Sequence, residues 1–497
     1  MEKVEKEHSY LHILKYAGIF GGVQGANIFI SLVRNKCLAL LLGPSGMGLI
    51  SLFNSTIGLL ANVSNLGLPV SGVKTISEKL ESGHEAEVFE TVNLIRSWSV
   101  LAALLGMLLC IVCSPLLDKF TFTWGNHVLH FVLLSPVVAM TVLAGGELAV
   151  LKALRQLKAL ALVSLYTMLA SLFVSVPVFY FWGQRGIVPV LLLQVFFQLL
   201  LVLFWSYRKV PLQLSFSTSV LAGGRTIVKL GLAFVAAGVF NSAAEFFMRS
   251  FLSRTAGLEV VGLFNAACSL VLLYSGVIFA SLETDYFPRL SAVGKNDRLK
   301  MNTCVNRQIE VNILLIGPLA CLLVWALPFL IPVLYNSKFL GMLSLAQWTT
   351  MALLFRAVYL PIEYLPLTQG ASRVYLCQEA LSVLLLFVAQ IIGFLCAGLP
   401  GMGIGMLIAY LLEMLGVIIY NRHYFSFRLS TPAWIYLLVE VFFGGLMAML
   451  VVCFECQGWL YWLMGFAISL FCFVFSFSRL KKGMSVHLDF LSRFFKQ

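Results

Sequence analysis

The sequence has little charge. Only 11% of its 497 residues are Asp, Glu, Lys or Arg, whereas 60% are hydrophobic, and the mean hydropathy is +0.93. In a soluble globular protein about a quarter of the residues are charged, so this composition excludes that class. The sequence also lacks HExxH, GxxxxGK[ST] and a dinucleotide-type glycine run before a helix. Nothing in it therefore predicts a zinc protease, an ATPase or a dinucleotide-dependent enzyme.

Signals for metal binding or external catalysis are equally scarce. Two pairs of cysteines have CxxC spacing, Cys110/Cys113 and Cys453/Cys456, but neither has a histidine or a second pair nearby. We expect no metal site and no cofactor. The loops predicted on the outer side are too short to carry a catalytic domain. A membrane-embedded polysaccharide polymerase or acyltransferase is thus disfavoured, and we expect that the protein is not an enzyme.

What the sequence does contain is long apolar runs. Counting about 20 apolar residues per crossing gives about fourteen transmembrane helices, centred near residues 28, 57, 104, 139, 169, 196, 240, 270, 321, 356, 387, 411, 442 and 468. An even number places both termini on one side, and the basic stretch from Arg479 makes that side the cytoplasm. The formal net charge of +12 reflects this topology, so no nucleic-acid partner is expected.

An internal repeat organises the chain. A shift of 214 residues aligns the first span with a second-half segment without a gap and pairs Lys15/Lys229, Asn27/Asn241, Gly43/Gly257, Gly48/Gly262 and Leu49/Leu263. Duplication of this kind is typical of transporters. We expect an all-α polytopic membrane protein with two pseudo-symmetric six-helix lobes, residues 1–210 and 211–425. Residues 426–497 add two further spans and an amphipathic cytoplasmic tail.

Four cations lie within or beside the predicted spans, where a charge costs about 2.5–3.5 kcal/mol on insertion scales. Arginine offers a planar fork that matches phosphate oxygens, so a cavity holding such cations favours an anionic substrate. The candidate pyrophosphate ligands are Arg34, Lys36, Arg249 and Arg356. Glu245 and Glu363 lie on the helix faces of Arg249 and Arg356, so simple ion pairing explains those two equally well. For Arg34 no acid is present on the same helix.

Polar and acidic residues in the spans supply the remaining candidates. A carboxyl in apolar surroundings can take up a proton near neutral pH, so four carboxylates are candidates for coupling to a proton or sodium gradient: Glu147, Glu245, Glu363 and Glu413. Helix-end placement or ion pairing is the competing interpretation. Three further polar residues are candidate sugar contacts: Gln24, Asn27 and Asn241.

The run from Leu41 to Glu78, LLGPSGMGLISLFNSTIGLLANVSNLGLPVSGVKTISE, resembles the opening of the Wzx-type polysaccharide (O-antigen) flippases. These belong to the multidrug/oligosaccharidyl-lipid/polysaccharide (MOP) exporter superfamily. The resemblance rests on a Leu-Gly-Pro turn, Gly48, the run Asn65-Leu66-Gly67-Leu68 and a following Ile-Ser-Glu. In the second half, VGLFNAACSL is similar to the family's repeat. Around Arg34, LVRNKCLALLLG also resembles the first-span arginine motif of the lipid II flippases, with Asn35 where that motif has aspartate.

The resemblance implies a fold like that of the MATE transporters and lipid II flippases. It also implies flipping of an undecaprenyl-pyrophosphate-linked oligosaccharide, an O-antigen or capsule unit, across a bacterial inner membrane. Membrane lipids and the polysaccharide polymerase or chain-length machinery are the implied partners. In lipid II flippases an extra pair of helices forms a groove for the lipid tail, a role that residues 432–478 would take here. The alternative is a cation or drug exporter of the MATE type, which would need an acidic cavity.

Overall fold

The computed structural model describes the chain except for residues 1, 84, 214–217, 294–296, 455–457 and 495–497. The described part is helical and contains no strand. Its helices are α1 (Glu2–Ser64), α2 (Leu68–Glu81), α3 (Glu85–Thr121), α4 (Val128–Ala153), α5 (Leu157–Trp182), α6 (Ile187–Tyr207), α7 (Thr218–Ala256), α8 (Leu258–Ala292), α9 (Arg298–Leu334), α10 (Leu343–Thr368), α11 (Ser372–Phe425), α12 (Thr431–Phe454) and α13 (Gly458–Phe494), with short 3-10 turns η1 (Gly183–Gly186) and η2 (Ser337–Met342).

Two of these helices are bent and each contains two predicted spans. Helix α1 turns at Gly43, which has φ 64° and precedes Pro44. Helix α11 turns at Ala397 and Gly398. Among the described residues, eight helical stretches are long and apolar enough to cross a membrane, and three of them exceed 40 residues: α1, α11 and the continuous α5–α6 stretch. With the long helices α7, α8 and α10, this confirms the polytopic all-α prediction of about fourteen spans.

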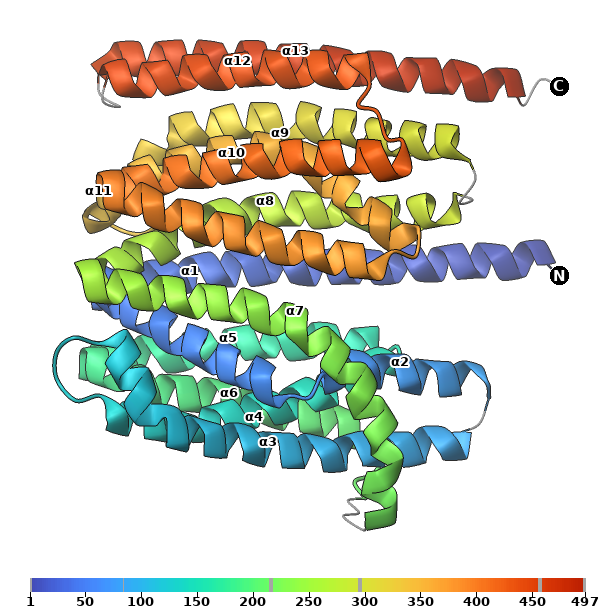
Figure 1. Cartoon of the computed structure of the whole chain (residues 1–497), viewed down its shortest axis with the longest axis vertical. Coiled ribbons are helices and arrows are strands. Elements are labelled where there is room, and N and C mark those ends of the chain that lie inside the picture. Colours follow the sequence, from blue (N-terminus) through green and yellow to red (C-terminus); the bar gives the residue numbers. More distant parts are fainter. Residues whose placement is uncertain (1, 84, 214–217, 294–296, 455–457, 495–497) are drawn as a thin grey trace. The chain divides into compact units, whose positions relative to one another are not determined.

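The helices form two compact units. The first comprises Met1–Gly262 with Leu334–Asn336, and the second comprises Leu263–Val333 with Ser337–Gln497. In the first unit α3 and α6 pack on α4, while α5 and α7 pack on α1; in the second, α10 packs along α11 and α12 along α13 (Figure 1). Helix α7 opens the second repeat in sequence but packs in the first unit. The division into two lobes with boundaries at residues 210 and 425 stays a prediction, which rests on the sequence repeat.

Glycines at repeat-equivalent positions bring two backbones into contact. Gly43 and Gly257 both have positive φ, 64° and 89°, and each lies at the sharp turn into the next helical segment. Five residues after each turn comes Gly48 or Gly262. A Cβ on Gly48 would lie 2.0 Å from the carbonyl oxygen of Leu258, and one on Gly262 would lie 1.9 Å from that of Pro44. Only glycine permits this approach.

A second close approach explains part of the Asn-Leu-Gly-Leu motif. Gly67, with φ 69°, precedes α2, and a Cβ there would lie 2.1 Å from the carbonyl oxygen of Gly231 on α7. The Asn65 side-chain oxygen accepts a hydrogen bond from the Gly67 amide at 2.8 Å. The motif thus shapes the turn that leads into α2 and lets α7 pack against it.

A buried ion pair ties α3 to α4 and α6. Arg96 donates through Nε to Glu147 at 2.9 Å, and the side chains are 2% and 7% exposed. Its guanidinium also donates to the carbonyls of Val210 and Pro211 and to the hydroxyl of Ser206. Ser206 donates in turn to the other Glu147 oxygen at 2.5 Å. Both charges are therefore fully engaged within the first unit.

Removing one member of this pair should be strongly destabilising. Arg96→Ala leaves the Glu147 carboxylate buried without its counter-charge, which costs about 3–5 kcal/mol in comparable pairs. We expect a clear fall in the thermal unfolding midpoint of the detergent-solubilised protein. The control is Arg155→Ala, because Arg155 and its partner Glu81 are 69% and 67% exposed and exposed pairs contribute only about 0–1 kcal/mol. Equal midpoints for the two variants would contradict this account.

Candidate functional site: a cation on helix α1, an acidic cluster and an apolar groove

Arg34 lies on α1, nine residues before the bend at Gly43. Its Nε atom is buried and has no hydrogen-bond partner among the described residues, and no ion pair of Arg34 is found there. Arginine stays protonated at any working pH. Its side chain is only partly exposed, so the structure presents a charge that other parts of the described chain do not neutralise. Such a charge is suited to bind an anion.

Lys36 makes a different set of contacts. Its ammonium group donates to the backbone carbonyl of Tyr335 at 2.5 Å. Beside it, the Asn336 amide donates to the carbonyl of Ala39 at 2.7 Å. Tyr335 and Asn336 directly follow α9 and belong to the first compact unit. Lys36 therefore holds the end of another helix, a role that the sequence did not predict.

Arg249 on α7 is engaged by neighbouring side chains. It donates through Nε to the hydroxyl of Ser51 at 2.7 Å and through a terminal nitrogen to Glu245 at 3.0 Å. Its side chain is 15% exposed and that of Glu245 is 63% exposed. The ion-pair interpretation of Arg249 thus has direct support, and Arg249 and Ser51 link α7 to the second half of α1.

The three predicted sugar contacts differ in accessibility. Gln24 and Asn241 are exposed on α1 and α7. Asn27 is 7% exposed and donates to the hydroxyl of Ser164 on α5 at 2.8 Å. The structure leaves Gln24 and Asn241 accessible, while Asn27 joins two helices.

Arg356 belongs to an acidic cluster in the second unit. Its guanidinium lies 5.5 Å from the centre of the Phe279 ring and is hydrogen-bonded to the Tyr410 hydroxyl. Glu363 is 5% and Glu413 8% exposed. The carboxyl group of Glu363 interacts with that of Glu379. The cluster is completed by Tyr359 and Ser382, which donate to Glu413.

This cluster is acidic in sum because three carboxyl groups surround one guanidinium. One oxygen of Glu363 is buried without a hydrogen-bond partner in the described chain, so this oxygen can accept a further hydrogen bond. Such a site is suited to exchange protons or a small cation. Of the other predicted coupling residues, Glu147 pairs with Arg96 and Glu245 with Arg249, so neither joins it.

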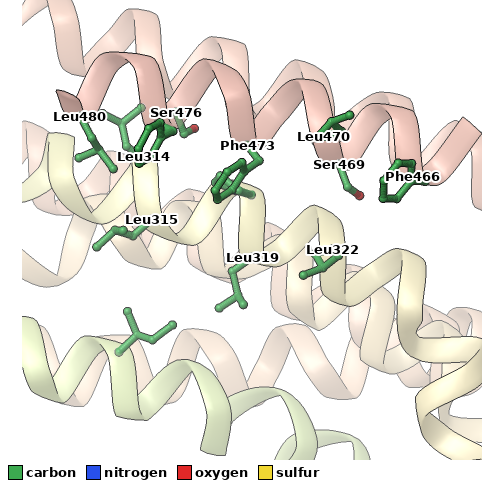
Figure 2. Close-up of a pocket in the computed structure, with 13 residues that line it drawn as sticks. Leu314, Leu315, Leu319, Leu322, Phe466, Ser469, Leu470, Phe473, Ser476 and Leu480 are labelled. Atoms are coloured by element: carbon green, nitrogen blue, oxygen red, sulfur yellow. The ribbon is translucent and has the colours of Figure 1, made fainter. Parts of the chain in front are cut away.

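An apolar groove of about 550 Å³ runs between α9 and α13. Figure 2 shows lining side chains from both helices, among them Leu315, Leu319 and Leu322 of α9 and Phe466 and Phe473 of α13. The full lining is Ile278, Leu314, Leu315, Pro318, Leu319, Leu322, Phe466, Ser469, Leu470, Phe473, Ser476, Phe477 and Leu480. Only two hydroxyl groups interrupt this apolar surface, so it is suited to hold a hydrocarbon chain.

A buried carboxyl group fixes the α13 wall of this groove. Glu440 on α12 is fully buried and accepts hydrogen bonds from Cys472 at 2.8 Å and Ser476 at 2.5 Å, both on α13. A Cβ on Gly317 of α9 would lie 2.1 Å from a Glu440 oxygen. Near the other end of the contact, the hydroxyl of Tyr461 donates to the carbonyl of Trp325 at 3.1 Å. The two added helices are thereby docked on α9.

Residues 13–293 match the family profile described as polysaccharide biosynthesis protein. The chain belongs to this family. No curated protein matches it. Structurally, it is similar to the lipid II flippase MurJ in an inward closed conformation, with a TM-score of 0.74, 14% identity, and 94% of this chain and 99% of that chain covered.

Two further structures extend the likeness within the MOP superfamily. An inward-facing multidrug resistance MATE transporter gives a TM-score of 0.67 at 16% identity, covering 80% of this chain and 94% of that chain. A MOP superfamily transporter from Pyrococcus furiosus gives 0.58 at 16% identity, covering 83% and 96%. At these identities the likeness concerns the fold, which is therefore that of the MurJ and MATE transporters. The predicted relation to polysaccharide biosynthesis proteins is confirmed by the family match, and the fold is the one that the resemblance implied.

Three contributors were not predicted from the sequence: Arg96, Glu379 and the groove. Arg96 and Glu379 stand near the starts of spans, where charged residues are common and carry little information. A carboxyl partner 51 residues away, as for Arg96, leaves no local pattern.

The two CxxC pairs give no sign of a metal site in the described residues. Of the pair Cys453/Cys456, residue 456 lies outside them, while Cys110 and Cys113 are free thiols. Groups of three or more potential metal ligands are absent from the part of the chain described.

Proposed function

We propose that this protein is a flippase for a polyprenyl-pyrophosphate-linked oligosaccharide, an O-antigen or capsule unit, which it moves from the cytoplasmic to the outer leaflet of a bacterial inner membrane. The observation that supports this most directly is Arg34, a partly buried arginine without a counter-charge among the described residues. In a polysaccharide biosynthesis protein with a MurJ-like fold, the matching group is the anionic head of a lipid-linked sugar. Polysaccharide polymerase and chain-length proteins are the expected partners.

Arg34 would bind the pyrophosphate through paired hydrogen bonds from its planar fork. The exposed amides of Gln24 and Asn241 would bond sugar hydroxyls, and Asn27 would support α1 through its hydrogen bond to Ser164. Arg249 would have to leave Glu245 to join the substrate, and Lys36 would have to leave Tyr335. Arg34 is therefore the principal head-group ligand in this proposal, and Arg249 and Arg356 are secondary candidates.

The groove between α9 and α13 is the proposed site of the polyprenyl tail. Its wall is hydrocarbon and aromatic over nearly its whole length (Figure 2), so a hydrocarbon tail would be held there by van der Waals packing, as it is among lipid tails. A head group held in a polar cavity and a tail held in an apolar groove would keep the tail in the bilayer throughout the transfer.

The acidic cluster of Glu363, Glu379 and Glu413 is the proposed coupling site for a proton or sodium gradient. Glu363 and Glu413 interact electrostatically with Arg356, and Glu379 interacts with both carboxyl groups. A change in proton or sodium occupancy alters the charge around Arg356. This would bias the second unit between two states, provided that each state binds the ion differently.

Arg34→Ala should abolish surface polysaccharide, because it removes the charge that binds the pyrophosphate, whereas Arg34→Lys should retain part of it. The first measurement is the thermal stabilisation of the protein in lipid nanodiscs by a polyprenyl-pyrophosphate oligosaccharide. We expect stabilisation of the wild type and its loss in Arg34→Ala. The matched control is Arg373→Ala, which removes an exposed arginine at the start of α11. Stabilisation by a hydrophobic organic cation alone would replace this proposal with a drug exporter.

Glu413→Gln and Glu363→Gln should uncouple transport from the gradient. Both keep the size and hydrogen-bonding capacity of the side chain but fix it in a neutral form. In proteoliposomes we expect ion-gradient-driven flipping to fall at least tenfold while the substrate still stabilises the protein. Glu90→Gln, at an exposed position on α3, serves as the control. Unchanged gradient dependence in both variants would exclude this cluster as the coupling site.

Leu319→Trp should narrow the groove and slow the flipping of a long-chain substrate, because indole would occupy space that the tail needs. A short-chain prenyl substrate should be affected less. The comparison variant is Leu384→Trp, since Leu384 is 54% exposed on α11 and is not part of the groove lining. If both tryptophan variants flip the long-chain substrate at the wild-type rate, the tail does not use this groove.

A further inference from the structure

The two repeats touch at one end of the first unit, which we call the hairpin end and define by Gly43, Gly257, Lys119 and Tyr335. Two contacts there are reciprocal. The Cβ position of Gly48 lies against the carbonyl of Leu258, and that of Gly262 against the carbonyl of Pro44. Under the 214-residue shift Pro44 corresponds to Leu258 and Gly48 to Gly262. Each repeat thus offers the other the same glycine and the same carbonyl.

Two cationic side chains make similar contacts between the repeats nearby, although the 214-residue shift places Lys36 on Ser250 and Arg254 on Leu40, so the donors are not at equivalent positions. From the first repeat, Lys36 donates to the carbonyl of Tyr335, directly after the end of α9. From the second repeat, Arg254 on α7 donates to the carbonyl of Lys119 near the end of α3, at 3.2 Å. The shift places Lys119 on Val333, two residues before Tyr335, so the two acceptors are near-equivalent. Edge-to-face packing of Phe120 and Phe247, with ring centres 6.5 Å apart, adds to the second contact.

Both the hydrogen bonds from the cations and the glycine contacts are favourable, but both can break when the helices separate. The last carbonyls of a helix lack intrahelical partners and carry partial negative charge, so a cation there is stabilised. Such hydrogen bonds can be exchanged for water when the elements separate. The glycine contact has no side chains that interlock, because two backbones simply lie against each other. This combination suits a contact that forms and opens repeatedly.

We propose that these contacts form a latch that closes the hairpin end, with Lys36 and Arg254 as its positioning residues and Gly48 and Gly262 as its contact surface. The latch must open before anything can leave at this end. The hairpin end faces the outer side of the membrane in the proposed function, and this assignment rests on that proposal. Lys36 then acts in gating and not in binding the head group.

The test uses the full-length chain with its native cysteines replaced and a reporter, Ser253→Cys, at the hairpin end, where Ser253 is 4% exposed. Labelling by a membrane-impermeant maleimide is measured in intact spheroplasts and in inverted vesicles, without substrate. Gly48→Val and Gly262→Val should raise the labelling rate at least threefold, since valine cannot fit against the opposing carbonyl. The matched controls are Gly58→Val on α1 and Gly276→Val on α8, because a Cβ at either glycine meets nothing within 4 Å.

The double variant Lys36→Gln, Arg254→Gln provides a second measurement that does not depend on overpacking. It should also raise labelling, and Lys36→Arg with Arg254→Lys should restore the wild-type rate. If the valine variants do not accumulate in the membrane, the labelling rates of the glutamine double variant and of the Lys36→Arg, Arg254→Lys variant decide the test. Labelling that stays at the wild-type rate in the glutamine variant overturns the latch. An increase confined to inverted vesicles would support the latch but overturn the orientation in the proposed function.

Discussion

The structure depends on the cost of placing a cation in a hydrocarbon environment. A charge in this position must be paired, hydrated or bound to an anion. Arg96 and Arg249 illustrate the first solution, since each has a carboxylate within 3.0 Å. Arg34 has no carboxylate partner among the described residues, so within that part of the chain its charge is left to water or to a ligand. In the proposed function an anionic head group would satisfy this charge, and the helices around Arg34 would have to separate to admit it.

A second constraint comes from glycine. Each repeat bends at a glycine with positive φ and then presents another glycine to its counterpart, so the repeat is preserved where backbones meet. A substitution at these positions meets a carbonyl oxygen, which cannot move as the end of a side chain can. The same argument applies to Gly67 against Gly231. The motif residues that carry the family resemblance are therefore explained by packing, independently of any substrate.

Much of the fold was predictable because hydrophobic length and internal repetition are properties of single segments. All the predicted span centres fall within helices, and the glycine turn at residue 43 is visible as Leu-Gly-Pro. The site was less predictable because its contacts join distant segments. Arg34 could be identified from the absence of a local acid, whereas the Lys36 contact with Tyr335 spans 299 residues. Glu147 was a candidate for ion coupling on its own helix, and only the fold reveals Arg96 beside it.

The buried Glu440 carboxyl has a consequence for the evolution of the added helices. Its two oxygens are satisfied only by α13, and its side chain lies against a glycine of α9. A larger residue at position 317 would occupy the space of the Glu440 side chain, and a chain without α13 would keep a buried carboxyl without its donors. Loss of α13 alone should therefore be destabilising, which links the presence of α12 to that of α13.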